Sequence, residues 1–229
     1  FKCDWSSDVC SSDLNTEDMT ETVATALNNI NESGEYHDTD GDIVSKIRWE
    51  CSCLQKKCGA CAMLINGRAR LACDSFLKEY VNRKTKEGRI RLEPLKKFPV
   101  VADLIADRSI MFDNLRTLKV WLDEEVNVQE KAIDNAYEAS RCLQCGCCLE
   151  VCPNFYPEGD FVSAAGFVPN ARLLSELSED GRDKVRALYK EHVYDGCAKS
   201  LACQKVCPAG IDMDHILSRS NAISIWRRK

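Results

Sequence analysis

Long apolar runs are absent from this sequence. None reaches eighteen residues, so no segment is expected to span a membrane by itself. A basic N-terminal segment followed by an apolar stretch is also missing, so we expect no signal peptide. Positive charge is not in excess, because 31 Lys and Arg stand against 36 Asp and Glu, and we therefore expect no nucleic-acid partner. The only histidines, His37, His192 and His215, are scattered, and we assign them no role.

Cysteine, in contrast, is abundant, with fifteen residues in 229. In a short secreted chain so many cysteines would indicate disulfides. Here the chain is long, and most of the cysteines are grouped at intervals of two to five residues. This spacing is typical of thiolate ligands to metal in a reducing compartment.

The first half of the chain has mixed helix and strand signals. Met19, Val23, Leu27 and Ile30 form one apolar stripe, which predicts a helix over residues 15–31. Residues 62–72 are predicted to form a β-hairpin, because their central Asn-Gly pair suits the two positive φ angles of a type I′ turn. The alternating residues 89–94 predict a further strand, ended by a proline.

After residue 100 the apolar periodicity becomes helical. We expect one or two helices within residues 100–125 and others at 129–140, 170–193 and 211–226, with Gly181 interrupting the third segment. The change of periodicity indicates a domain boundary near residues 98–105.

The first cysteine run has a specific spacing. Cys53-x4-Cys58-x2-Cys61, followed by Cys73, is the ligand spacing of a plant-type [2Fe-2S] site. Three thiolates on one tight loop would wrap a small cluster, and the fourth would tie that loop to the far end of the hairpin. A four-cysteine zinc site is the alternative, although such sites favour paired C-x2-C knuckles. Cys51 lies outside the pattern.

A second run has the spacing of bacterial ferredoxins, in which the fourth cysteine ligates the other cluster of a pair. The run is Cys142-x2-Cys145-x2-Cys148-x3-Cys152-Pro153, and its partner is Cys197-x5-Cys203-x3-Cys207-Pro208. The exchange rule predicts one [4Fe-4S] site with the ligands Cys142, Cys145, Cys148 and Cys207.

The remaining site has three cysteines, Cys152, Cys197 and Cys203. Ser200 stands where a regular run would have a fourth cysteine, so we expect a [3Fe-4S] cluster. Ser200 could instead be an unusual oxygen ligand, or it could only pack or hydrogen-bond. After residue 14, the three sites leave only Cys51 and Cys147 without a ligand position.

A [2Fe-2S] domain ahead of a helical domain with one full and one three-ligand site resembles the iron–sulfur subunit of succinate dehydrogenase and fumarate reductase. The resemblance runs from about Asn15 to the C-terminus. It implies an α+β fold: an N-terminally truncated β-grasp ferredoxin domain at residues 15–102, followed by an α-helical two-cluster ferredoxin domain at 103–229.

The resemblance also implies a function. Such a subunit relays electrons between FAD in a flavoprotein subunit and a membrane quinone, as part of an oxidoreductase of the tricarboxylic acid cycle or of fumarate respiration. We therefore expect a flavoprotein partner, one or more membrane anchor subunits, and a peripheral location on the cytoplasmic face of the inner membrane. Two alternatives stay open: a subunit of a soluble, thiol-linked fumarate reductase, and a free-standing electron carrier.

Two segments depart from the family pattern. Residues 1–14 stand where the family has two strands, and they look like translated sequencing adapter, so we expect a non-native leader. Asn154-Phe155-Tyr156 replaces the tryptophans that often follow the Cys-Pro, and Ala198 replaces a frequent histidine. Tyr156 is therefore our candidate for a hydrogen bond to quinone, and Ser200 is a candidate for the same cluster environment.

Overall fold

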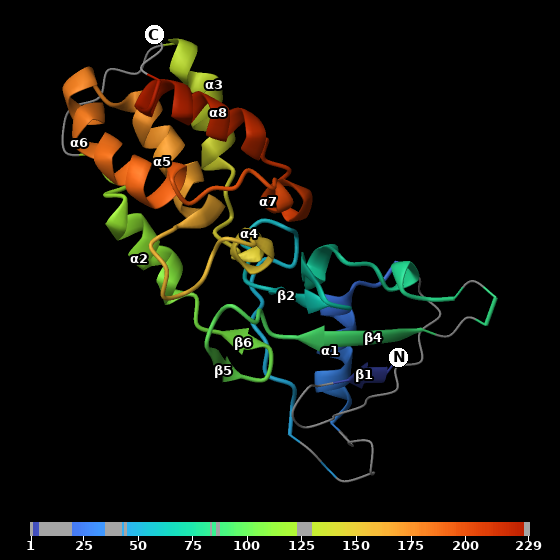
Figure 1. Cartoon of the computed structure of the whole chain (residues 1–229). Coiled ribbons are helices and arrows are strands. Elements are labelled where there is room, and N and C mark those ends of the chain that lie inside the picture. Colours follow the sequence, from blue (N-terminus) through green and yellow to red (C-terminus); the bar gives the residue numbers. More distant parts are fainter. Residues whose placement is uncertain are drawn as a thin grey trace. The chain divides into compact units, whose positions relative to one another are not determined.

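The computed structural model describes residues 2–4, 20–34, 43, 45–82, 84–85, 88–122 and 130–226, and only the backbone of 2–4 and 130–133. The chain divides into two compact units, Phe1–Asp107 and Arg108–Lys229. The first holds the sheet and the second is helical (Figure 1), so the predicted α+β fold is confirmed. No helix within the described ranges is long and apolar enough to cross a membrane.

The first unit contains a four-stranded sheet in the order β1-β4-β2-β3. The predicted hairpin is present: β2 (Ala62–Ile65) pairs antiparallel with β3 (Arg68–Leu71), and the turn residues Asn66 and Gly67 have φ of 49° and 73°. The predicted strand is also present, as β4 (Arg89–Glu93), and it pairs with β2.

The helix of this unit, α1 (Val23–Ser33), covers part of the stretch predicted at residues 15–31. Thr22 caps its N-terminus by accepting a hydrogen bond from the Thr25 N–H, and the left-handed Gly34 ends it. The stripe residues Val23, Leu27 and Ile30 are buried, whereas Met19 lies outside the described residues. The helix packs on η1 (Ala72–Asp74), the 3₁₀ turn that follows β3, with η2 (Leu77–Glu79) beyond it.

The backbone of the expected leader takes part in the sheet. β1 (Lys2–Asp4) pairs in parallel with Arg89–Arg91 of β4. An open strand edge offers N–H and C=O groups that any backbone can satisfy, whatever its side chains. The pairing is therefore compatible with a non-native segment, and the leader assignment stays a prediction.

The expectation of helix from residue 100 onward is wrong for the first nine residues. β5 (Val100–Ala102) and β6 (Ile105–Ala106) form a small hairpin, and helix begins only at α2 (Ser109–Thr117). Asp103 turns the chain with φ of 46°, and its carboxylate accepts from the N–H (2.8 Å) and Nε (3.1 Å) of Arg48. A short apolar run does not distinguish strand from helix by periodicity, and here the distant Arg48 fixes the turn.

The second unit packs around α5 (Ser163–Glu176), which contacts α2, α3 (Glu130–Ser140), α4 (Cys147–Val151) and α8 (Met213–Ser224). Its core includes Phe167, Leu174, Tyr189 and Ile216, all 2% exposed or less. The buried Tyr189 hydroxyl donates to Asn221 Oδ1 at 2.8 Å, so this polar group is paired rather than orphaned.

The predicted interruption at Gly181 is displaced. The chain breaks after α5, and α6 (Glu179–Tyr189) begins at the Ser178 cap, whose Oγ accepts from the Gly181 N–H at 3.0 Å. Gly181 therefore lies inside the helix, because the serine cap decides where the helix starts. A π-helical turn, η3 (Lys190–Tyr194), follows, and the last short helix before α8 is α7 (Ala202–Val206).

Candidate metal centres

In the first unit, the hairpin brings two of the predicted ligands together. Cys61 directly precedes β2, and Cys73 lies in η1 just after β3. Because Ala62 pairs with Leu71, the two ends of the hairpin meet, and the Sγ atoms of Cys61 and Cys73 are 3.4 Å apart. Cys53 and Cys58 belong to the preceding loop.

That loop points its backbone N–H groups at the sulfurs. Cys53 Sγ accepts from Gln55 (3.3 Å) and Lys57 (3.2 Å), Cys73 Sγ from Lys56 (3.3 Å), and Cys58 Sγ from Ala60 (3.5 Å). Left-handed residues make this possible, with φ of 52° at Leu54, 58° at Lys56 and 75° at Gly59. Such alternating backbone forms the concave N–H nest that binds anions, and iron–sulfur centres among them.

The thiols of this loop differ in acidity. The N–H groups of Gln55 and then Lys57 lower the pKa of Cys53 to about 7. Burial raises the pKa of Cys61 to about 12; the backbone N–H of Cys73 acts against this, and the Cys73 thiol acts with it. The N–H donors therefore favour a thiolate at Cys53, whereas Cys61 needs a nearby positive charge to ionise.

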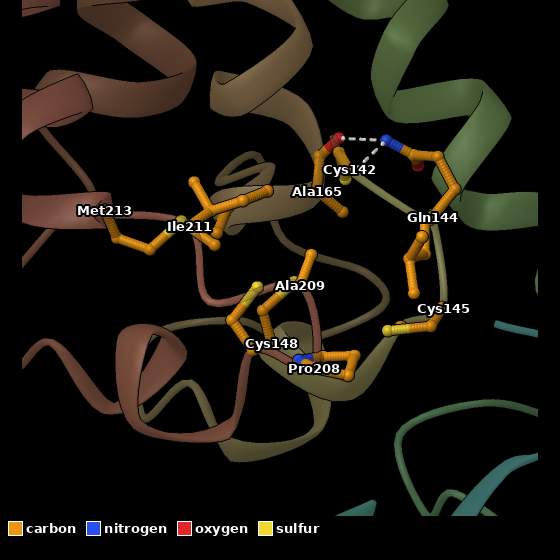
Figure 2. A pocket seen from close by; sticks show the side chains of 13 residues that line it. Cys142, Gln144, Cys145, Cys148, Ala165, Pro208, Ala209, Ile211 and Met213 are labelled. Carbon is orange, nitrogen blue, oxygen red and sulfur yellow. Dashed lines mark hydrogen bonds between the residues drawn. The ribbon is translucent and has the colours of Figure 1, made fainter. Parts of the chain in front are cut away.

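In the second unit, one pocket gathers the four cysteines predicted to hold the [4Fe-4S] cluster (Figure 2). Apolar residues of α5, of the loop that follows Cys207 and of the start of α8 form most of the rest of its wall. The lining includes Cys142, Cys145, Cys148, Cys207, Gln144, Ala164, Ala165, Pro208, Ile211 and Met213.

A second pocket of this unit gathers Cys152, Cys197 and Cys203, together with Ser200. It is held in shape by Asn154, whose Nδ2 donates to the Gly196 carbonyl at 2.9 Å. The Ser200 Oγ accepts from the Ala202 N–H at 3.5 Å. The two runs therefore cross over: Cys152 lies apart from the other cysteines of its own run, and so does Cys207.

Burial disfavours the charged thiolate form of several cysteines in these two pockets. Burial, and then the thiols of Cys145, Cys142, Cys203 and Cys207, raise the pKa of Cys148 well above its usual value. Burial raises the pKa of Cys142 and of Cys203 to about 11 in the same way. Several thiols around one apolar pocket fit a cationic iron core that touches three or four sulfurs at once. A single ion is a different case, because no three His, Cys, Asp or Glu side chains among the described residues are arranged to hold one.

The two cysteines without a ligand position, Cys51 and Cys147, differ in burial. Cys51 is exposed. Cys147 is fully buried, and its thiol and N–H donate hydrogen bonds to Cys145, a predicted ligand, which lower the pKa of Cys145 to about 7. A hydrogen-bonding role for Cys147 was missed because it has no place in the ligand spacing.

The quinone-side candidates are only partly brought together. Ser200 lines the second pocket, whereas Tyr156 is 61% exposed and is not part of that lining. Gln144, Lys199 and Leu201 escaped sequence reasoning altogether. All three adopt left-handed backbone in the cysteine loops, with φ of 49°, 57° and 54°, and residues of these types give no local signal for it.

Two family models match successive parts of the chain. Residues 7–113 match the model of a 2Fe-2S iron-sulfur cluster binding domain, and residues 138–211 match that of a 4Fe-4S dicluster domain. The chain of one solved structure, the Mycobacterium smegmatis Sdh1 complex in the apo form, superimposes with a TM-score of 0.71 at 20% identity, covering 93% of this chain and 88% of the other. This likeness concerns the fold.

Similar curated proteins identify the family more narrowly than these domain matches do. The succinate dehydrogenase iron-sulfur subunit of Bacillus subtilis is 34% identical over 79% of this chain and 73% of its own length. The fumarate reductase iron-sulfur subunit of Wolinella succinogenes is 28% identical over 80% of this chain and 77% of its own length. An uncharacterised iron-sulfur protein of Methanocaldococcus jannaschii is 34% identical over 85% of this chain, but over only 37% of that longer protein.

Proposed function

Since the chain belongs to the family of succinate dehydrogenase and fumarate reductase iron–sulfur subunits, we propose that it relays electrons between FAD in a flavoprotein subunit and a membrane quinone. The observation that supports this most strongly is the sorting of the helical unit's cysteines into one pocket of four and one of three. Electron relay needs several centres held in one chain, and the loop around Cys53 provides a third.

Each predicted site has its own ligands in this proposal. Four thiols of the sheet unit hold the [2Fe-2S] cluster: Cys53, Cys58, Cys61 and Cys73. Cys142, Cys145, Cys148 and Cys207 hold the [4Fe-4S] cluster, and Cys152, Cys197 and Cys203 hold the [3Fe-4S] cluster, with Ser200 at the vacant ligand position. When bound, the clusters supply one-electron oxidation and reduction, and no side chain of this chain forms or breaks a substrate bond.

In this proposal the cysteines bind the clusters, the backbone around them orients the ligand sulfurs, and the apolar side chains exclude water. N–H groups of the Cys53 loop donate to ligand sulfurs, which favours the more negative, reduced form of a cluster. Apolar walls such as Ile211 and Met213 keep water from the four-cysteine pocket. The proposal places the chain at the cytoplasmic face of the inner membrane, in contact with a flavoprotein and with membrane anchor subunits, and it includes Tyr156 on the quinone side.

Electron paramagnetic resonance of the anaerobically purified full chain tests the proposal. A sharp signal from the oxidised sample should be lost on dithionite reduction, while a [2Fe-2S] signal develops, as expected for one three-iron site beside a [2Fe-2S] site. A silent oxidised sample that gives two interacting [4Fe-4S] signals on reduction would contradict the three-iron assignment. Metal analysis that finds zinc and no iron in the purified chain would overturn the proposed electron relay.

One observation favours a second candidate, a subunit of a soluble, thiol-linked fumarate reductase. The match to only 37% of a longer iron-sulfur protein means that these two units also occur within a larger chain. Recovery of the complex from the host's membrane fraction with a flavoprotein supports the quinone-linked relay. Recovery from the soluble fraction, with thiol-dependent fumarate reduction, supports the alternative.

A further inference from the structure

One polar side chain in the four-cysteine pocket, Gln144, is aimed at a ligand sulfur (Figure 2). Its Nε2 lies 3.4 Å from Cys142 Sγ and 3.1 Å from the carbonyl oxygen of Ala165. An amide NH₂ has two hydrogens, and these two acceptors use both. The side chain therefore links a ligand to the neighbouring helix α5.

The orientation of the amide follows from its partners. The Ala165 carbonyl can only accept, so the amide must present its nitrogen, not its oxygen, to that atom. The same nitrogen faces Cys142, and a thiolate sulfur is likewise an acceptor. Exchanging the amide's nitrogen and oxygen would lose both hydrogen bonds, so the donor is directed at the sulfur.

Pro169 explains why Ala165 offers its carbonyl. A helical carbonyl normally accepts from the N–H four residues later, and that residue is Pro169, which has none. The carbonyl of Ala165 therefore lacks its helical donor, and the Gln144 amide takes that place. A proline in the middle of α5 thus provides the anchor for a side chain in the cysteine loop.

The backbone of Gln144 supports a functional reason for this arrangement. Its φ of 49° is left-handed, which costs a residue with a Cβ about 1–2 kcal/mol. Strain of this kind persists where the surroundings over-determine it, and it is concentrated at functional sites. Here the strained backbone lies between two ligand positions, Cys142 and Cys145.

We infer that Gln144 is a positioning residue whose amide donates to Cys142 and raises the reduction potential of the cluster in this pocket. The reduced cluster carries more negative charge on its sulfurs, so an N–H donor stabilises the reduced form more than the oxidised one. The inference rests on the proposed [4Fe-4S] site, and it adds a residue outside the ligand set to the control of the relay.

Redox titration of the full chain, followed by electron paramagnetic resonance, tests the inference. Gln144→Met keeps the length of the side chain and removes the donor. We expect unchanged iron and sulfide content, and a [4Fe-4S] midpoint lowered by the equivalent of about three- to tenfold in the one-electron equilibrium constant, about 28–59 mV. The [2Fe-2S] midpoint should stay in place. A loaded variant with an unmoved [4Fe-4S] midpoint would overturn the inference.

Gln204→Met is the matched control. Gln204 also lies next to a cysteine, Cys203, but its side-chain amide oxygen accepts from the Asp214 N–H at 3.0 Å. Its hydrogen bond to the Cys203 sulfur comes from the backbone N–H, which the substitution leaves in place. Its substitution should leave the [4Fe-4S] midpoint unchanged, whereas a shift as large as that of Gln144→Met would show that the effect is unspecific and would contradict the inference.

A measurement on the unsubstituted chain removes any dependence on how the variant folds. With the glutamine side-chain amides labelled with ¹⁵N, electron–nuclear double resonance of the reduced [4Fe-4S] cluster should detect a nitrogen coupling. Absence of that coupling, with the cluster signal present, would refute the role of Gln144. Absence of any [4Fe-4S] signal would instead refute the proposed function, so the two failures are distinguishable.

Discussion

Lys56 shows how single residues shape the first cysteine loop. It is left-handed, its N–H donates to Cys73 Sγ, and its Nζ pairs with Asp74 Oδ2 at 2.6 Å. Both charged side chains are more than a third exposed, so the ion pair contributes at most about 1 kcal/mol. The left-handed backbone costs a similar amount, and glycine would avoid that cost.

We therefore expect Lys56→Gly to be more stable than Lys56→Ala by about 1 kcal/mol, because both lose the ion pair but only glycine relieves the backbone. Urea unfolding of the two variants measures the difference. Lys57 is the control, since its φ is not positive, and there the alanine variant should be the more stable one. The same order at both positions would contradict the strain argument.

Gly196 precedes the predicted ligand Cys197, and it has no room for a side chain. An added Cβ would lie 2.7 Å from Phe161, whose ring lines the three-cysteine pocket. Gly196→Ala should displace the ring or Cys197, and should lower the amount of the oxidised-state signal at least severalfold while the [4Fe-4S] signal remains. Spin quantification together with iron analysis measures this.

Gly159→Ala is the comparison for that prediction, because its Cβ would meet no atom closer than 3.4 Å, an ordinary contact. It should keep the full oxidised-state signal. Equal losses in both variants would mean that the loss of signal does not come from the close packing at Gly196 and would contradict the prediction.

At the scale of elements, helix ends were harder to predict than helices. The Asn-Gly hairpin was predicted correctly because a type I′ turn is a local property of two residues. The interruption predicted at Gly181 lies three residues earlier, because the Ser178 side chain caps the start of α6. The hairpin of β5 and β6 was missed because its turn depends on Arg48, which is remote in sequence.

Ser178 provides a direct measure of that cap. Ser178→Ala removes the acceptor for the Gly181 N–H and should lower the free energy of unfolding by about 1 kcal/mol. Ser178→Asp keeps an acceptor and should retain most of the stability. Chemical denaturation of the loaded chain checks both values, and an alanine variant as stable as the parent would show that α6 does not depend on this cap.

At the scale of the whole molecule, the two pockets are lined in part by two helices, α4 and α7, that are too short to be stable alone. α4 and α7 each have five residues, they contact each other, and cysteines of both line the pockets. Helices of this length do not form in isolation. Bound clusters should therefore hold both of them in place, since a ligand that binds only the folded state stabilises it.

Removal of the clusters should consequently destabilise the cysteine segments of the helical unit more than the strands of the sheet unit. Hydrogen exchange of the apo chain should show loss of protection at residues 142–152 and 197–207, at least tenfold, whereas the strands β2 and β3 keep theirs because their pairing is independent of metal. Mass spectrometry with and without bound iron compares the two regions. Equal loss throughout the chain would contradict this division.

The sequence by itself determined what depends on spacing along the chain: the three cysteine runs, the Asn66-Gly67 turn and the order of a sheet unit before a helical one. Tertiary structure decided what depends on residues far apart. Cys207 lines the pocket that begins at Cys142 only because α4 and α7 pack together. Gln144, in the cysteine loop, faces Cys142 because Pro169 of the helix α5 leaves the Ala165 carbonyl without its helical donor. Spacing is local and can be read from the sequence, whereas hydrogen-bond partners across helices exist only once the chain has folded.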